Sequence, residues 1–282
     1  MRVITAPAAM RAWSDAHRAA GRRVALVPTM GALHAGHLAL VDEARRHADV
    51  VIVSIFVNSL QFDRPDDFTG YPRPIDDDLE MCRARSVDAV YAPVAATMYP
   101  EGFETHVEPG PLGDVLEGEH RPGHFRGVAT VVAKLFLAAR PHVAVFGQKD
   151  FQQLTIIRRM NDDLDMGVEI IGLPTVREPD GLALSSRNRR LTAAQRAAAV
   201  CVPRMLDTVV HLYRGGEADT AVLAAVGPEV VRSEPLARFE HLVIVDDRTL
   251  QAVAIADEHS VAVAAVWFGD VRLIDNRRLA LP

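Results

Sequence analysis

The sequence predicts an α/β fold, with a Rossmann-like, doubly wound parallel sheet followed by a smaller α+β domain. In residues 1–175, short apolar runs alternate with helical segments of about 10–15 residues, which is typical of βαβ units. Val50–Val57 is an almost uninterrupted apolar run, as expected for a strand that is buried on both faces of a parallel sheet. After Pro174 the order changes to helices followed by strands, so a second domain is expected.

The first predicted domain, residues 1–175, contains alternating strands and helices. The expected strands are short and apolar: Val24–Val27, Val50–Val57, Ala89–Ala92, Val143–Phe146 and Val168–Leu173. The expected helices have apolar residues at helical spacing or a start signal such as proline: Pro7–Ala20, Gly36–His47, Pro74–Arg85, Gly127–Ala139 and Asp150–Asp162. Two segments rich in polar and turn-forming residues, Asn58–Arg73 and Pro93–Pro122, are expected to be irregular.

The second predicted domain, residues 176–282, is joined to the first by Thr175–Arg189. Thr192 and Gln195 have the spacing of a capping box, which predicts a helix from Thr192 to about Tyr213. A second helix and three strands follow, at Asp219–Ser233, Phe239–Val245, Ser260–Phe268 and Val271–Asp275. This order predicts helices packed against a small antiparallel sheet.

Composition and charge exclude several classes of protein. The 282 residues carry a net charge of −6, so the sequence lacks the basic excess of a nucleic-acid-binding protein. Its apolar runs are far shorter than the roughly 20 residues of a membrane-spanning helix, and its beginning lacks the apolar core of a signal peptide. Cys82 and Cys201 have no metal-ligand spacing, so we expect a cytoplasmic protein without disulfides or structural zinc.

A strand that runs through a glycine turn into a helix is predicted at Val24–Val41. Such a turn can bind an anion, because free backbone N–H groups and the positive end of the helix dipole converge there. His34 and His37 lie at the start of this helix and could donate hydrogen bonds to a phosphate. The pair could equally be two ordinary histidines at a helix end, and no third metal ligand lies nearby in the sequence.

Two further segments contain residues suited to phosphate. Phe146–Gln153 again follows an apolar strand and contains Lys149, one of only two lysines in the chain. A strand end in a parallel sheet borders the ligand crevice, although Lys149 could also be an exposed loop residue. Arg177–Asn188 contains a Pro-Asp-Gly turn followed by Ser185–Arg187, whose guanidinium suits phosphate oxygens. A solvated turn is the plainer interpretation of this third segment.

These segments also occur together in one protein family. The motifs, in chain order, are PTMGALHAGH (Pro28–His37), VNSLQF (Val57–Phe62), YPRP (Tyr71–Pro74), RPGHFRG (Arg121–Gly127), FGQKDFQQ (Phe146–Gln153), REPDGLALSSRN (Arg177–Asn188) and RLIDN (Arg272–Asn276). They are spread from residue 28 to residue 276, so the resemblance extends over nearly the whole chain. The sequence resembles the pantoate–β-alanine ligases, or pantothenate synthetases, of the nucleotidyltransferase superfamily with HIGH-type signatures.

The resemblance implies an ATP-dependent enzyme that joins (R)-pantoate to β-alanine through a pantoyl-adenylate and releases AMP and pyrophosphate. It implies catalytic roles for His34, His37, Lys149 and Arg187. The positions that it assigns to ATP are Met30, Gly31, Ala32, Leu33, His34, Ala35, Gly36, His37, Gly147, Gln148, Lys149, Asp150, Val176, Leu184, Ser185, Ser186 and Arg187. A mobile second domain could close as a lid and exclude water from the adenylate.

The resemblance also implies the remaining ligands and the assembly. Pantoate and β-alanine would be bound by Gln61, Gln153, Asn58, Tyr71 and Arg121. Mg²⁺ would bridge the ATP phosphates, with Asp77 and Asp78 as candidate protein ligands, although these acids could equally stabilise the first turn of their own helix. A homodimer is expected, without nucleic-acid or membrane partners.

Two departures from the family pattern leave alternatives open. Ser59 replaces the usual proline after Asn58, and Gln148 replaces the usual glutamate before Lys149. These changes leave a non-catalytic nucleotide-binding relative as one alternative. A ligase or nucleotidyltransferase for another acid is a second alternative, which Gln61 and Gln153 argue against. An RNA-binding module is the least favoured because the net charge is acidic.

Overall fold

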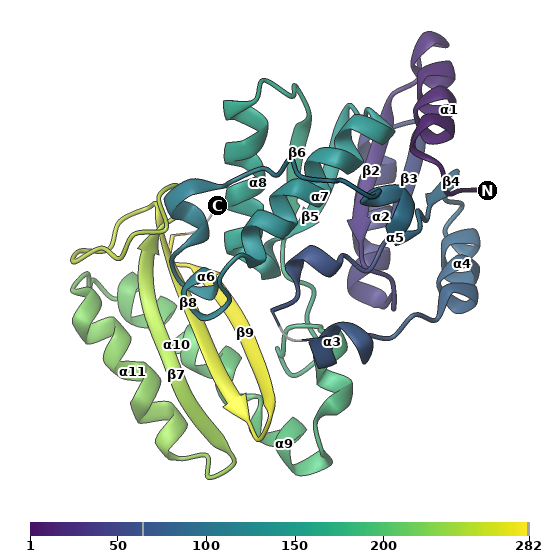
Figure 1. Ribbon diagram of the computed structural model, residues 1–282. Coiled ribbons are helices and arrows are strands. Elements are labelled where there is room, and N and C mark those ends of the chain that lie inside the picture. Colours follow the sequence, from purple (N-terminus) through teal and green to yellow (C-terminus); the bar gives the residue numbers. More distant parts are fainter. Residues whose placement is uncertain (64, 281–282) are drawn as a thin grey trace. The chain divides into compact units, whose positions relative to one another are not determined.

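The structure is a computed structural model that describes residues 1–63 and 65–280; Arg64, inside the predicted loop Asn58–Arg73, lies outside the described residues. The chain divides into two compact units. The N-terminal unit comprises Met1–Gln148 and Gln152–Pro174, and the C-terminal unit comprises Lys149–Phe151 and Thr175–Pro282. Figure 1 shows the ribbon of both units.

The N-terminal unit is built on a six-stranded sheet in which all paired strands are parallel. Its strands, in spatial order, are β1 (Arg2–Ile4), β4 (Ala89–Tyr91), β3 (Val50–Ile55), β2 (Val24–Thr29), β5 (Val143–Gly147) and β6 (Glu169–Leu173). The strand order reverses at β2 and β5. In a doubly wound sheet, ligands bind outside the carboxyl ends of the strands at this point.

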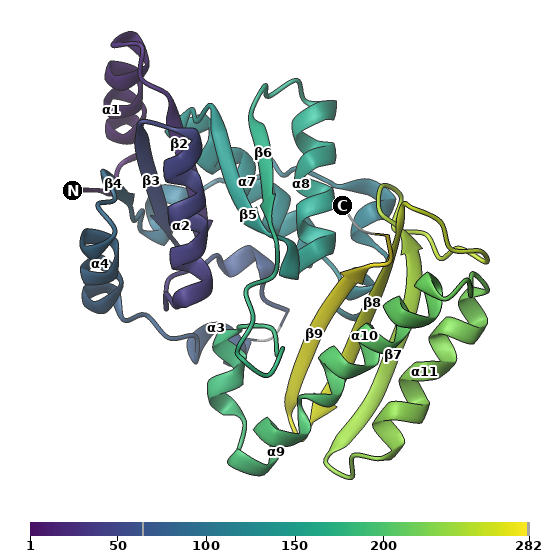
Figure 2. The ribbon, with the colours of Figure 1, turned by 180° about the vertical axis from the view of Figure 1, so that it is seen from behind.

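Helices cover both faces of this sheet, as Figures 1 and 2 show from opposite sides. The longer helices are α1 (Pro7–Ala19), α2 (Ala35–His47), α4 (Ile75–Ala84), α7 (His124–Ala139) and α8 (Phe151–Asp163). Successive strand residues point to opposite faces, so Val24 and Leu26 pack with α1, α7 and α8, whereas Ala25 and Val27 pack with α2 and α4. The predicted α/β fold class is therefore confirmed.

The segments predicted to be irregular contain several short helices. These are η1 (Ser59–Gln61), α3 (Pro65–Thr69), α5 (Ala95–Met98), η2 (Gly110–Gly113) and α6 (Glu117–His120). None is longer than five residues, so none leaves an apolar periodicity in the sequence. The short, largely exposed strand β1 was not predicted for the same reason.

The C-terminal unit contains the antiparallel sheet β7 (Ala237–Asp246), β8 (Ser260–Phe268) and β9 (Val271–Arg278). Helices α10 (Cys201–Arg214) and α11 (Thr220–Arg232) pack on this sheet around buried side chains such as Met205, Leu223 and Phe268. Figure 2 shows both helices in front of the sheet. The predicted α+β character of this part is confirmed.

The single helix predicted from Thr192 to Tyr213 is wrong in one respect. The capping box of Thr192 and Gln195 is present, but α9 (Ala193–Ala198) ends before α10 begins at Cys201. Pro203 has no N–H to donate to the carbonyl of Ala199, and its ring would clash with that carbonyl in a continuous helix. In α10, Pro203 lies in the first turn, where a missing donor costs nothing.

Cys82 and Cys201 are both buried free thiols. Burial raises the pKa of each to about 11. Across residues 1–63 and 65–280, no helix combines the length and apolar character needed to span a membrane.

Candidate active site

The histidine segment, Met30–His37, runs from the end of β2 into the first turn of α2, at the strand end where the sheet order reverses. Gly31 has φ = 81°, which glycine adopts without strain, and Ala32 has φ = 50°, which is unusual for a residue with a Cβ. A Cβ at Gly31 would lie 2.8 Å from Asp78 Oδ2. Gly31 is therefore required both by its backbone conformation and by the close approach of Asp78.

His34 and His37 lie against each other at the start of α2. Their ring centroids are 4.1 Å apart, and the ring planes are tilted by 34°. His34 is the N-cap residue, and its Nδ1 accepts the N–H of Gly36 at 3.1 Å. In a neutral imidazole the other nitrogen then carries the hydrogen, so Nε2 of His34 is a donor.

The prediction of free backbone N–H groups in this turn is wrong at several positions. Ala32 and Leu33 donate their N–H groups to Asp78 at 2.9 and 2.7 Å. Gly31 donates to Thr29 Oγ1. The carboxylate of Asp78 on α4 accepts the N–H groups of Ala32 and Leu33 only. It lies 46 and 45 residues away from them in sequence, so the sequence did not reveal this pairing. The histidine side chains at the start of α2 suit a phosphate whether or not these N–H groups are engaged.

The candidate metal ligands Asp77 and Asp78 differ in their surroundings. Asp78 is 1% exposed, and each of its oxygens accepts a backbone N–H, whereas Asp77 is exposed. Burial raises the pKa of Asp78, and the two backbone hydrogen bonds oppose this rise. Asp78 therefore directs its oxygens to the backbone of the turn, and the metal role of Asp77 stays a prediction.

Gln61, predicted to bind substrate, lies beside the histidine segment. Its Nε2 is 3.1 Å from Met30 Sδ, and its backbone carbonyl accepts from Arg121 Nη2 at 3.0 Å. His124 Nδ1 is 2.7 Å from the same carbonyl. The tertiary structure thus brings Met30, Gln61 and Arg121 together, although the sequence separates them widely.

Asn58 supports Gln61 from below the surface. The Asn58 side chain, 1% exposed, donates to Gln61 Oε1 at 3.0 Å and to the carbonyl of Gly127 at 3.1 Å. Its Oδ1 accepts from the Tyr99 hydroxyl at 2.6 Å and from the N–H of Leu60. These bonds use both donors and both lone pairs of the amide. Asn58 therefore positions Gln61, and its direct contact with substrate stays a prediction.

Two other predicted substrate residues, Tyr71 and Gln153, come from different segments of the N-terminal unit. Tyr71 packs edge to face on Phe62 with ring centroids 5.7 Å apart. Gln153 is half-buried on α8, whereas its neighbour Gln152 is 5% exposed and hydrogen-bonds the backbone of Leu112, Val115 and Glu117. The structural role of Gln152 was not recognised from the sequence, because its partners lie in an irregular segment.

Gln148, one of the two departures from the family pattern, has a structural role in this chain. Its side-chain amide donates to the carbonyl of Gly172 in β6 at 3.0 Å. A glutamate carboxylate has no hydrogen to donate in this bond. Gln148 therefore ties the end of β5 to β6.

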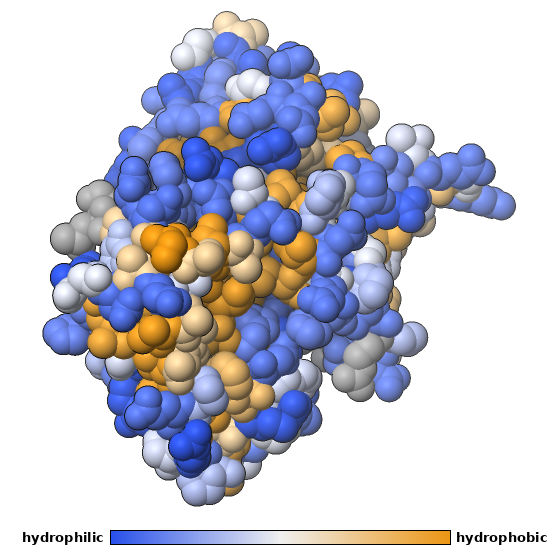
Figure 3. All heavy atoms as spheres, turned by 90° about the vertical axis from the view of Figure 1, so that its left-hand side faces the viewer, coloured by the Kyte–Doolittle hydropathy of each residue, from blue (hydrophilic) through white to orange (hydrophobic). Residues whose placement is uncertain are grey.

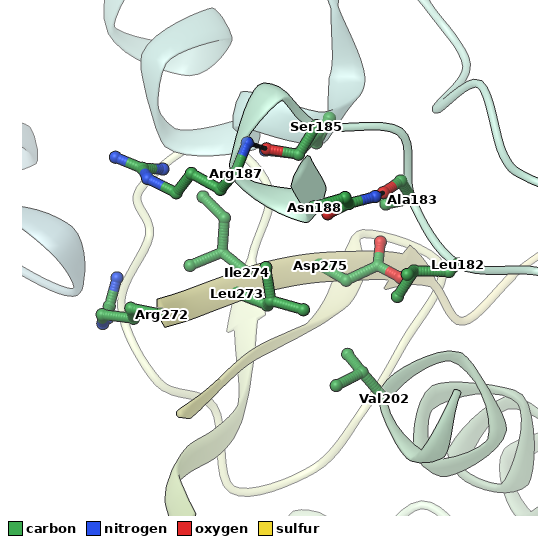
Figure 4. A pocket seen from close by; sticks show the side chains of 11 residues that line it. Leu182, Ala183, Ser185, Arg187, Asn188, Val202, Arg272, Leu273, Ile274 and Asp275 are labelled. Carbon is green, nitrogen blue, oxygen red and sulfur yellow. Dashed lines mark hydrogen bonds between the residues drawn. The ribbon is translucent and has the colours of Figure 1, made fainter. Parts of the chain in front are cut away.

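Lys149 belongs to the C-terminal unit and lines a pocket within it. The same pocket is lined by Ser185, Arg187, Arg272 and Asp275. Figure 4 shows the side chains of Arg187 and Arg272 extending toward the same end of the pocket, away from Asp275. The Lys149 side chain is 18% exposed, with Nζ 3.4 Å from Asp150. Arg272 is bound by Glu240, with Nη2 2.6 Å from Oε1. Lys149 and Arg187, with the hydroxyl of Ser185, are therefore the groups of this pocket that suit phosphate oxygens.

The loop that carries Ser185 is ordered by local hydrogen bonds. The N–H of Leu184 donates to the carbonyl of Val176 at 3.0 Å, so these two predicted ATP contacts are neighbours. Ser185 is the N-cap of η4 (Ser186–Arg190), and its Oγ accepts the N–H of Arg187. Asn188 closes the loop by donating to the carbonyl of Ala183, as Figure 4 shows. The RLIDN motif (Arg272–Asn276) in β9 contributes Arg272 and Asp275 to the lining of the same pocket.

Asp275 is 2% exposed and forms a bidentate ion pair with Arg177, with N–O distances of 2.7 and 2.9 Å. Burial raises the pKa of Asp275, and the hydrogen bonds from Arg177 oppose this rise. Asn276 Nδ2 donates to the carbonyl of Lys149 at 3.0 Å. Asn276 therefore fixes the backbone of the lysine.

Comparison with known proteins identifies the family. Residues 2–278 match the family model of pantoate-beta-alanine ligase. The chain is 46% identical over 276 residues to pantothenate synthetase of Geotalea uraniireducens (strain Rf4), covering 98% of each protein. It is 50% identical over 263 residues to pantothenate synthetase of Vibrio vulnificus (strain YJ016), covering 93% of this chain and 87% of that protein.

Solved structures agree with this match. A crystal structure of pantothenate synthetase from Thermus thermophilus superposes with a TM-score of 0.92 at 43% identity and covers 100% of both chains. Pantoate-beta-alanine ligase from Francisella tularensis, complexed with beta-gamma ATP and beta-alanine, superposes with a TM-score of 0.81 at 31% identity and covers 100% of this chain and 99% of that one. The chain therefore belongs to the pantoate–β-alanine ligase family.

Proposed function

We propose that this protein is a pantoate–β-alanine ligase that uses ATP to join (R)-pantoate to β-alanine and forms pantothenate, AMP and pyrophosphate. Family membership supports the activity, and the Francisella tularensis complex supports ATP and β-alanine as ligands. One observation of this structure carries the proposal. Met30, next to the turn that precedes His34 and His37, contacts Gln61, so groups suited to phosphate and to an organic acid lie in one place.

The proposed reaction has two steps. A carboxylate oxygen of pantoate attacks the α-phosphorus of ATP, and the bond to pyrophosphate breaks. The amine of β-alanine then attacks the acyl carbon, AMP leaves, and the amine loses a proton. We propose that His34, His37, Lys149 and Arg187 contact the triphosphate and offset the negative charge that develops on pyrophosphate. Gln61 and Gln153 are the proposed ligands of pantoate, with Tyr71 and Arg121 nearby in the substrate site.

We propose that Mg²⁺ enters bound to the phosphates of ATP. The two oxygens of Asp78 already accept backbone N–H groups, so Asp78 does not fit a metal ligand, whereas the exposed Asp77 is still a proposed contact of the ATP-bound ion. We further propose the domain limits 1–175 and 176–282, with a lid role for the second domain, and a cytoplasmic protein.

A homodimer is the proposed assembly. Figure 3 shows hydrophobic side chains gathered in a patch on a face that is otherwise largely hydrophilic, as expected of a surface that binds a partner. Light scattering coupled to gel filtration is expected to give twice the monomer mass of 30.8 kDa. A monomer mass at micromolar concentration would contradict this proposal.

A single-turnover experiment tests the function. Enzyme in excess over ATP, with pantoate and without β-alanine, is expected to release pyrophosphate and retain an adenylate. If the pantoate carboxylate carries ¹⁸O, one labelled oxygen is expected in AMP after β-alanine is added. Pyrophosphate release with another acid but not with pantoate would favour a different ligase. ATP binding without pyrophosphate release would favour a non-catalytic relative.

Replacing Gly127 by alanine is expected to weaken pantoate binding severalfold. A Cβ at this position would lie 2.2 Å from the carbonyl oxygen of Leu60, in the short helix η1 that ends at Gln61. Alanine is the better helix former, so any destabilisation, expected at about 1–3 kcal/mol for such overpacking, comes from this contact. The measurements are the KM for pantoate and the thermal midpoint.

Leu137→Ala is the matched control on the same helix, because Leu137 is 59% exposed. It is expected to leave the KM for pantoate unchanged. An unchanged KM in Gly127→Ala as well would show that the position of η1 does not govern pantoate binding.

A further inference from the structure

Asp78 is a buried acid that the proposed chemistry does not use. It is 1% exposed on α4, and its carboxylate lies against the turn between β2 and α2. Oδ2 accepts the N–H of Ala32 at 2.9 Å, and Oδ1 accepts the N–H of Leu33 at 2.7 Å. Oδ2 also faces Gly31 closely enough that no side chain fits there.

The turn requires such a partner. The N–H groups of Ala32 and Leu33 are buried with their residues, and a buried donor without an acceptor costs about 1–3 kcal/mol. Ala32 also has φ = 50°, a conformation that surrounding contacts must maintain. Two adjacent donors that converge on one side chain are satisfied by a carboxylate, which has two acceptor oxygens and no hydrogen when ionised.

We propose that Asp78 is a positioning residue that holds the turn in front of His34 and His37, and that it is not a metal ligand. Leu33, which Asp78 holds, is covalently next to His34. His34 is the N-cap of α2, and its ring lies 4.1 Å from that of His37. A shift of the turn therefore moves both rings, and misplacing a catalytic group by about 1 Å can cost about a hundredfold in rate.

Asp78→Asn is the central variant, because asparagine keeps the shape but replaces one acceptor oxygen by a donor. That donor faces the N–H of either Ala32 or Leu33, so one hydrogen bond is lost. Asp77→Asn removes an equal charge from an exposed neighbour on the same helix and is the matched control. The expected effect of Asp78→Asn on activity rests on the proposed function. The effect on the amide spectrum does not, because that spectrum is recorded without ligands.

The direct readout is the amide spectrum of ¹⁵N-labelled protein without ligands. In wild type, the amides of Ala32 and Leu33 are expected to exchange slowly with solvent. In Asp78→Asn these two amides and those of the His34–His37 segment are expected to shift, whereas Asp77→Asn leaves them in place. Fast exchange of both amides in wild type would overturn the proposal, even if the variant fails to fold.

The kinetic readout separates positioning from metal binding. Asp78→Asn is expected to lower kcat/KM for ATP by about 10–100-fold without changing the Mg²⁺ concentration that gives half-maximal rate. A raised Mg²⁺ requirement, or recovery of the rate at high Mg²⁺, would overturn the proposal in favour of a metal ligand. A wild-type rate in Asp78→Asn would also overturn it. An inactive wild-type protein would refute the proposed function and leave the amide measurement to decide the role of Asp78.

Discussion

Replacing Lys149 by methionine is expected to lower the rate of pyrophosphate release about 10²–10³-fold, the loss typical of removing one preorganised charge-stabilising group. Lys149 shares its pocket with Arg187 and Ser185 and is only 18% exposed, so its charge is poorly screened by water. Methionine keeps an unbranched side chain of similar length. Asn276 binds the backbone carbonyl of Lys149 and not its side chain, so the anchor of this segment is retained.

The measurement is pyrophosphate release in a single turnover with ATP and pantoate. Because charge develops on pyrophosphate in the transition state, the single-turnover rate constant at saturating ATP is expected to fall by a larger factor than the ATP concentration for half of that rate rises. Lys134, the other lysine of the chain, provides the control. Its ammonium lies 4.8 Å from the centre of the Phe103 ring, and Lys134→Met is expected to retain a rate close to wild type. If Lys149→Met releases pyrophosphate as fast as Lys134→Met does, Lys149 is not a catalytic residue.

Replacing Asp275 by leucine is expected to destabilise the protein by about 3–5 kcal/mol, the usual cost of removing one partner of a buried ion pair. Asp275 is 2% exposed, and Arg177 binds it through two hydrogen bonds. Leucine would leave the Arg177 guanidinium, whose side chain is 18% exposed, without its counter-ion. Urea denaturation followed by circular dichroism measures the loss of free energy. The unfolding curve is fitted with one transition for each compact unit, because a chain of two units does not have to unfold in one step.

Two comparisons test this interpretation of the ion pair. Arg190–Asp270 is an exposed pair in the same unit, and Asp270→Asn is expected to cost less than about 1 kcal/mol. The double variant Arg177→Met with Asp275→Leu is expected to lose less free energy of unfolding than the two single variants lose together, because no charge is then left buried alone. Strict additivity of the two losses would contradict a coupled pair.

The fold class could be predicted because its signals are local. The near-continuous apolar run at Val50 and the alternation of strands and helices depend only on residues close in sequence. The capping box at Thr192 was found for the same reason. The break before α10 could also have been found, since Pro203 stands inside the predicted helix.

The sequence by itself determined the α/β architecture, the family and the residue types available for phosphate and acid binding, because periodicity and motifs are written along the chain. Only the tertiary structure decided how the polar groups are shared. Asp78 satisfies the N–H groups of Ala32 and Leu33, so the turn that leads to His34 is held by a carboxylate from α4. Asn58 uses its whole amide to place Gln61, and Asn276 holds the backbone of Lys149. These pairings depend on hydrogen bonds between residues far apart in sequence, and such partners become known only when packing brings them within about 3 Å of each other.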